Sequence, residues 1–145
     1  MKSLLVALGC LISVLSYSQT EVASPVVEGK LIPLTEPHGH GIWLSAAKGE
    51  TYSIVDGEVL SAFSADGEMM ILIKTADKVI IYGNLEKTNL VKGDHVSKGD
   101  KIGALSSKYR QPYVLHFQAW KLFDKDKTAP LTYQETKDFV GYKGL

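Results

Sequence analysis

Short apolar runs with alternating polar positions dominate the chain from residue 41 onward. Turn sequences rich in glycine and aspartate separate these runs, such as VDGE, SADGE and TADK. This pattern predicts an all-β sandwich or hybrid barrel, in which three neighbouring runs pair as consecutive antiparallel strands, namely 57–63, 69–74 and 78–85. The full set of candidate strands is 41–46, 51–55, 57–63, 69–74, 78–85, 95–105 and 113–122.

No run of residues has the hydrophobic periodicity and length of a helix, except weakly near the C-terminus, in TYQETKDFVG at 132–141. Before the strands, residues 19–37 are polar and contain Pro25, Pro33 and Pro37. Proline removes a backbone donor, so this stretch predicts a leader or an edge strand rather than a second domain.

The N-terminus has the pattern of a secretory signal. Lys2 precedes an uncharged apolar run over residues 4–15, and the small-residue stretch SYSQ follows, which predicts cleavage after Ser18. We therefore expect a protein exported to the periplasm or the exterior of a bacterium. An alternative is that ALGC, ending at Cys10, is a lipobox whose cysteine is lipidated.

Composition excludes several classes of partner and chemistry. The 145 residues carry 16 basic and 16 acidic side chains, so neither nucleic acid nor an anionic membrane is indicated. No later stretch reaches the length of a transmembrane segment. The single cysteine, Cys10, lies in the signal, so the exported chain would have no disulfide, thiol nucleophile or cysteine ligand.

The stretch LVKGDHVSKGDKIGAL at 90–105 contains two KGD turns around HVS. In each turn the glycine can adopt a positive φ. The pattern fits several hybrid-barrel folds, including biotinyl and lipoyl carriers and sugar-phosphotransferase domains. A carrier needs an exposed lysine at a hairpin tip, and ADGEMMILIK does not place one there.

Four stretches in order, GIWLSAAKGETYSIVDGEVLSAF, ILIKTADKVIIYGNL, VKGDHVSKGDKIGAL and YVLHFQAW, resemble the LytM/lysostaphin-like zinc metallopeptidase family. The resemblance implies a LytM-like β domain of the duplicated hybrid motif type. The expected organisation is a signal peptide, a leader, this domain and a C-terminal tail, at 1–18, 19–28, 29–132 and 133–145. In the family, a His-x-Gly-Ile-Asp pattern supplies two zinc ligands and a Tyr-x-His-Leu pattern supplies a catalytic histidine. A His-Leu-His-Phe pattern supplies a second catalytic histidine and the third ligand.

The resemblance also implies that most of this active site is replaced. Gly39 and Trp43 stand where the ligand histidine and aspartate belong, and Asn84 and Val114 stand at the two catalytic histidines. His116 alone is retained. The family pattern thus implies a degenerate member that resembles the non-catalytic amidase-activator branch, with no catalytic residue and no metal site.

The former active-site groove becomes the candidate binding surface, lined by Gly39, Trp43, Tyr82, Asn84, Val114 and His116. Period-two alternation places Gln118 and Trp120 on the same strand face as His116. His38 and His40 do not rescue a metal site, because the family's carboxylate spacing leads from them to Ile42 and Leu44. Both histidines, and His95 between the KGD turns, are interpreted as polar loop or turn residues.

Two functions from different classes follow. The first is a non-catalytic cell-envelope module that binds peptidoglycan, a cell-wall amidase or another envelope protein without a cofactor. The second is a residual zinc-dependent peptidoglycan endopeptidase, in which His38 or His40 joins His116 and unidentified groups around the metal. Stoichiometric zinc in the purified protein would discriminate between them.

Overall fold

The computed structural model describes residues 24–33, 40–107 and 113–142. Short strands dominate these residues, because alternating apolar side chains and glycine-containing turns favour antiparallel pairing over helix. In chain order the elements are β1 (Lys30–Leu31), β2 (Ile42–Ala46), β3 (Glu50–Tyr52), β4 (Gly57–Ala65), β5 (Glu68–Lys74), β6 (Lys78–Lys87), β7 (His95–Val96), β8 (Lys101–Leu105), β9 (Tyr113–Phe123), β10 (Lys127–Pro130) and α1 (Tyr133–Val140).

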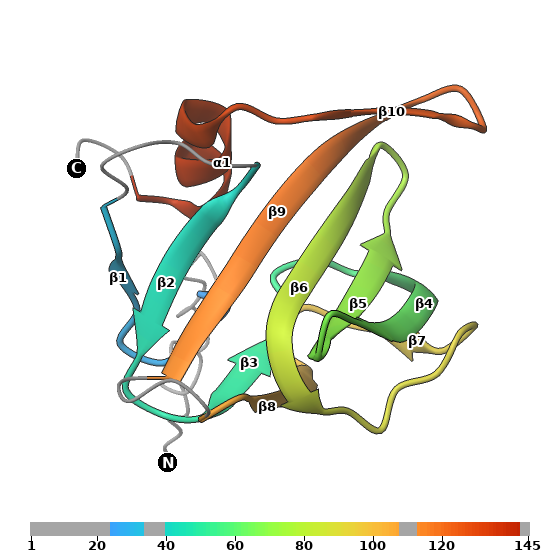
Figure 1. The fold of residues 1–145 in the computed structure, drawn as a ribbon. Coiled ribbons are helices and arrows are strands. Elements are labelled where there is room, and N and C mark those ends of the chain that lie inside the picture. The colour runs from blue at the N-terminus through green and yellow to red at the C-terminus, as the bar shows by residue number, and fades with distance from the viewer. Residues whose placement is uncertain (1–23, 34–39, 108–112, 143–145) are drawn as a thin grey trace, which may run out of the picture.

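The strands form one strongly curved sheet in the order β1-β2-β9-β6-β5-β4-β7 (Figure 1). β10 pairs with β9, while β8 joins β3 to β6 below the main sheet. Every pairing between these strands is antiparallel. The all-β prediction is confirmed, and so are the two predicted hairpins: Ser61 lies opposite Leu72, and Leu72 opposite Ile81.

The core lies on one face of β9 and its neighbours. Along β9, Leu115, Phe117 and Ala119 are buried, whereas the intervening residues are only half-buried. The period-two pattern therefore assigned the two faces of this strand correctly. On neighbouring strands, Ile42 and Ile80 belong to the same buried layer.

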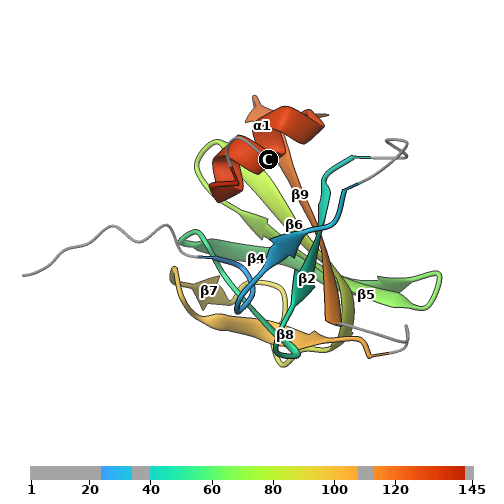
Figure 2. The same ribbon diagram turned by 90° about the vertical axis from the view of Figure 1, so that its left-hand side faces the viewer.

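A short helix covers one end of this core. Thr132 accepts a hydrogen bond from the Glu135 backbone, and the Glu135 carboxylate accepts one from the Thr132 backbone, which together form a capping box. Gly141 ends the helix with φ 97°. Figure 2 shows α1 seated at one end of the sheet, where Phe139 stacks on Phe117 at a centroid distance of 6.4 Å. The predicted C-terminal helical segment is thus present and packs on the core.

The described part of the expected leader also contacts the sheet. Val26 is 2% exposed and bridges to Thr51, whose hydroxyl donates to the Pro25 carbonyl at 2.8 Å. The predicted domain boundaries themselves stay predictions. Within the described ranges, no helix combines the length and apolar character needed to cross a membrane.

Candidate functional site

Trp43 and His116 form the centre of the candidate site. They lie directly opposite each other on β2 and β9. Their rings stack with centroids 4.1 Å apart and planes only 2° from parallel. His116 Nε2 lies 3.0 Å from the His40 carbonyl oxygen. Since a carbonyl only accepts, Nε2 carries the proton and donates, which leaves the lone pair of the neutral ring on Nδ1.

The surroundings of His116 favour its neutral form. Burial lowers the pKa of the imidazole below its usual value of 6.5, and the bond to the His40 carbonyl and the charge of Glu68 oppose this effect only in part. On the other side, Gly83 of β6 lies opposite His116, and a Cβ there would approach Nδ1 to 3.8 Å. The imidazole is therefore held between an indole, a backbone carbonyl and a glycine.

Asn84 has a structural contact at the position where the family has a catalytic histidine. Its backbone is left-handed, with φ 64°, a conformation that asparagine tolerates better than most residues. The side chain is 2% exposed, and its Nδ2 donates to the Val114 carbonyl at 2.6 Å. The backbone carbonyl of Asn84 accepts a hydrogen bond from the Ser106 backbone N–H at 3.0 Å. Asn84 thus joins β6, the start of β9 and the end of β8.

Val114 lies two residues before His116 on the half-buried face of β9, opposite Ser45 of β2. Trp43, Val114 and His116 therefore share one face of the sheet, as the alternation predicts. Asn84 reaches the same region through the Val114 carbonyl, although its side chain is almost fully buried.

Tyr82 lies in the core rather than in the groove, and this corrects its expected placement. It is 0% exposed, lies opposite Phe117 and contacts that ring edge-on at 5.5 Å. Its hydroxyl accepts a hydrogen bond from the Ile54 backbone at 3.1 Å. Burial raises the pKa of Tyr82 to about 12, so the phenol stays neutral.

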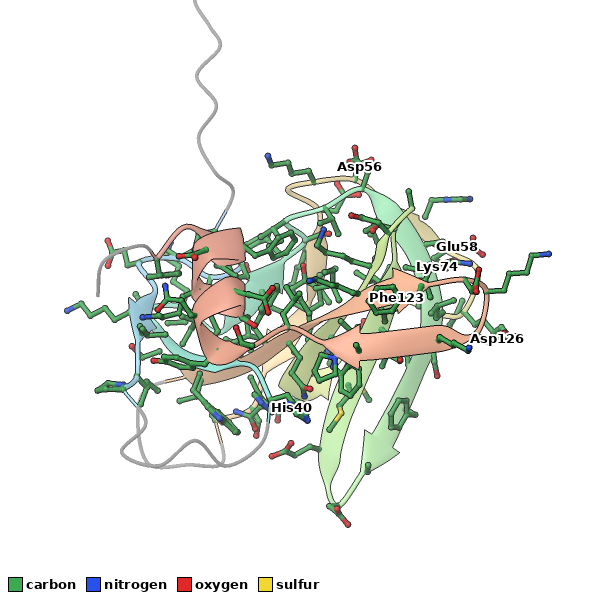
Figure 3. All side chains as sticks on the ribbon, turned by 90° about the horizontal axis from the view of Figure 1, so that it is seen from above. His40, Asp56, Glu58, Lys74, Phe123 and Asp126 are labelled. Carbon is green, nitrogen blue, oxygen red and sulfur yellow. The ribbon has the colours of Figure 1, made fainter. Side chains whose placement is uncertain are left out.

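Further along the same face, Trp120 and Gln118 extend the site beyond the predicted set. Trp120 Nε1 donates to Gln118 Oε1 at 3.2 Å, and the exposed ring of His40 contacts Trp120 edge-on at 5.4 Å. Figure 3 labels His40 beside this part of β9. The period-two alternation of the sequence places Trp120 and Gln118 on this face. It does not predict that His40 contacts both His116, through its carbonyl, and Trp120, through its ring. His38 and Gly39 lie outside the described residues.

Zinc, which the family implies, does not fit the residues around His116. A catalytic zinc takes about three protein ligands and keeps one position open. The Trp43 indole offers an N–H donor and no lone pair, and His116 offers one lone pair, on Nδ1, since its Nε2 donates to a carbonyl. Across 24–33, 40–107 and 113–142, no three His, Cys, Asp or Glu residues are grouped so as to hold a metal ion.

The sequence matches the family model described as Peptidase family M23 over residues 37–130. The match covers more than half of the chain, so the protein belongs to this family. No curated protein sequence matches the chain.

Solved peptidase structures share the fold. Lysostaphin from Staphylococcus simulans is 19% identical with a TM-score of 0.61, covering 86% of this chain and 57% of that chain. A putative M23 peptidase from Pseudomonas aeruginosa is 18% identical with a TM-score of 0.62, covering 85% and 52%. A zinc-containing peptidase from Vibrio cholerae is 19% identical with a TM-score of 0.57, covering 74% and 38%. The chain thus spans between 38% and 57% of the length of these three proteins. At these identities the similarity concerns the fold.

Proposed function

We propose that this protein is a catalytically degenerate M23 domain that binds a component of the bacterial cell envelope without cleaving it. Its ligand is peptidoglycan, or a protein that acts there such as a cell-wall amidase. The signal-like N-terminus supports export to the periplasm or the cell exterior, where both partners occur. The binding surface is the face of β2 and β9 that carries Trp43, His116, Gln118 and Trp120.

The stack of Trp43 on His116 is the observation that carries the proposal. In the family pattern these positions belong to a ligand aspartate and a ligand histidine. Here an indole covers one face of the imidazole at 4.1 Å, and the His40 carbonyl accepts the Nε2 proton at 3.0 Å. At the position of the ligand aspartate, Trp43 supplies no metal ligand, and His116 offers a single lone pair, on Nδ1, because its Nε2 donates to the His40 carbonyl.

The remaining chemistry of the surface suits binding. Aromatic rings contribute large contact areas at a small cost in conformational entropy, and such residues dominate the energetics of recognition. Gln118 is a neutral hydrogen-bonding group between His116 and Trp120 along β9, and its amide oxygen already orients the Trp120 indole. The surface therefore combines apolar rings with polar groups that can fix a ligand's orientation.

Sedimentation of the purified protein with isolated peptidoglycan tests the proposal directly. Trp43→Ala should weaken binding by more than ~1 kcal/mol, roughly fivefold in Kd. His95→Ala is the matched control, since His95 is exposed on β7, outside the sheet region that carries Trp43, and should bind like wild type. Both variants are checked for intact structure by circular dichroism.

Equal affinities for wild type and folded Trp43→Ala would place the binding surface elsewhere. If the protein does not sediment with peptidoglycan at all, the same pair of variants is applied to binding of a cell-wall amidase. Stoichiometric zinc together with EDTA-sensitive cleavage of peptidoglycan would replace the proposal by a residual endopeptidase.

A further inference from the structure

The second half of β4 is an open sheet edge. β7 pairs with β4 only at Gly57 and Glu58, and the Val59 backbone bonds to the segment before β7. From Ser61 to Ala65, β4 pairs with β5 on one side, and on the other side no strand of the described residues adjoins it. A backbone edge of this kind presents unpaired donors and acceptors to an incoming strand.

This edge lacks the features by which sheet edges usually prevent pairing. Residues 59–65 read VLSAFSA, without a charged residue or a proline. A bulge interrupts the register between Val59 and Ser61, but the five pairs beyond it are regular. Ala62, Phe63 and Ser64 are all exposed, with Phe63 at 43%. In Figures 2 and 3 the β4–β5 hairpin projects beyond the body of the domain, so a second molecule can reach its edge.

We infer that the edge of β4 pairs with the same edge of a second copy of this chain. In the sequence SAFSA at 61–65, the two positions on either side of Phe63 all carry a small side chain, Ser or Ala. In an antiparallel two-fold arrangement, Ser61 would lie opposite Ala65 of the other copy, and Phe63 opposite its own equivalent. Five such pairs supply about four to six backbone hydrogen bonds. The central aromatic pair adds a favourable cross-strand contact, and no like charges meet.

The pairing would also join the two candidate binding surfaces. Gln118 lies opposite Ile81, Ile81 opposite Leu72 and Leu72 opposite Ser61, so these residues share one sheet face. Phe63, two residues beyond Ser61, lies on that face as well. A two-fold axis perpendicular to the sheet would place both copies of the Trp43 surface on the same side. A ligand with repeated binding units could then be held at two points. The self-association itself does not depend on the proposed function.

Light scattering coupled to size exclusion, over a range of concentrations, tests the inference. Wild type should be a dimer that dissociates on dilution. Phe63→Lys removes the aromatic pair and sets two lysines opposite each other, so its dimer dissociation constant should rise by roughly tenfold or more. Phe123→Lys is the matched control, because Phe123 is also exposed, at 52%, but lies at the β9–β10 end of the molecule (Figure 3). It should dimerise like wild type.

A second measurement keeps the inference testable if Phe63→Lys fails to fold. In a Cys10→Ser background, Phe63→Cys should be joined into covalent dimers by a short bismaleimide, and Phe123→Cys should not. A wild-type protein that stays monomeric at high concentration would overturn the inference. So would undiminished dimerisation of folded Phe63→Lys, or occupation of this edge by an extended peptide of another protein in place of the second copy.

Discussion

The contact between Trp43 and His116 can be measured by a double-mutant cycle. The parallel rings, 4.1 Å apart, predict an interaction that removal of either side chain abolishes. Aromatic pairs of this geometry contribute about 0.5–1.5 kcal/mol beyond the area they bury. Trp43→Ala and His116→Ala should each destabilise the fold, and the double variant should be more stable than the sum of the two losses predicts, by about 1 kcal/mol.

The assay is urea unfolding followed by circular dichroism at about pH 8, where an imidazole with a lowered pKa is neutral in both states. The Trp43→Ala and His95→Ala pair serves as the control. These two residues lie on β2 and β7, which the strand order separates by β9, β6, β5 and β4, so their losses should add within about 0.3–0.5 kcal/mol. If the losses of unfolding free energy for Trp43→Ala and His116→Ala also add, the stacked rings do not stabilise the fold through their contact, and the reasoning is refuted.

Three further predictions concern the same region. Burial lowers the pKa of His116 below 6.5, so the unfolded chain takes up the proton first as the pH falls. The free energy of unfolding should therefore decrease as the pH drops below 6.5, and His116→Gln should flatten this decrease in urea titrations. Gly41→Ala and Gly93→Ala both strain a positive φ, of 96° and 95°, for about 1–2 kcal/mol. Only the Gly41 Cβ would meet backbone of β9, so that variant should lose at least about 1 kcal/mol more; equal losses would contradict the close approach. Gly39→His combined with Trp43→Asp should retain zinc after dialysis, whereas Trp43→Asp alone should not, as measured by elemental mass spectrometry.

The strand order of the central hairpins could be predicted from sequence because it depends on local signals. SADGE and TADK each contain residues suited to a tight turn, and the apolar runs between them have strand length. The same holds for the helix at 133–140, whose capping residues Thr132, Glu135 and Gly141 lie within a few positions of the elements they cap.

Tyr82 was misplaced because β6 is apolar on both faces. Ile80 and Tyr82 enter the core, while Ile81 lies opposite Gln118 on the other face, so alternation of polar and apolar residues cannot distinguish the two sides. The register against β9 decides the matter, since Tyr82 lies opposite the buried Phe117.

The contacts of His40 could not be predicted for a different reason. Its carbonyl, rather than its ring, accepts the proton of His116, and its ring contacts Trp120. Both depend on the path of the backbone into β2, where Gly41 adopts φ 96°. Hydrophobic periodicity carries no information on that path, although it placed His116 and Trp120 on one face.

Digestion of purified peptidoglycan tests the central claim most directly. Homogeneous wild-type protein, supplied with zinc, is incubated with peptidoglycan, and released fragments are identified by liquid chromatography and mass spectrometry. We expect no release of cross-bridge or stem-peptide fragments above a protein-free control, since Trp43, Asn84 and Val114 replace a zinc ligand and two catalytic histidines of the family pattern. Cleavage that EDTA abolishes and zinc restores would contradict it.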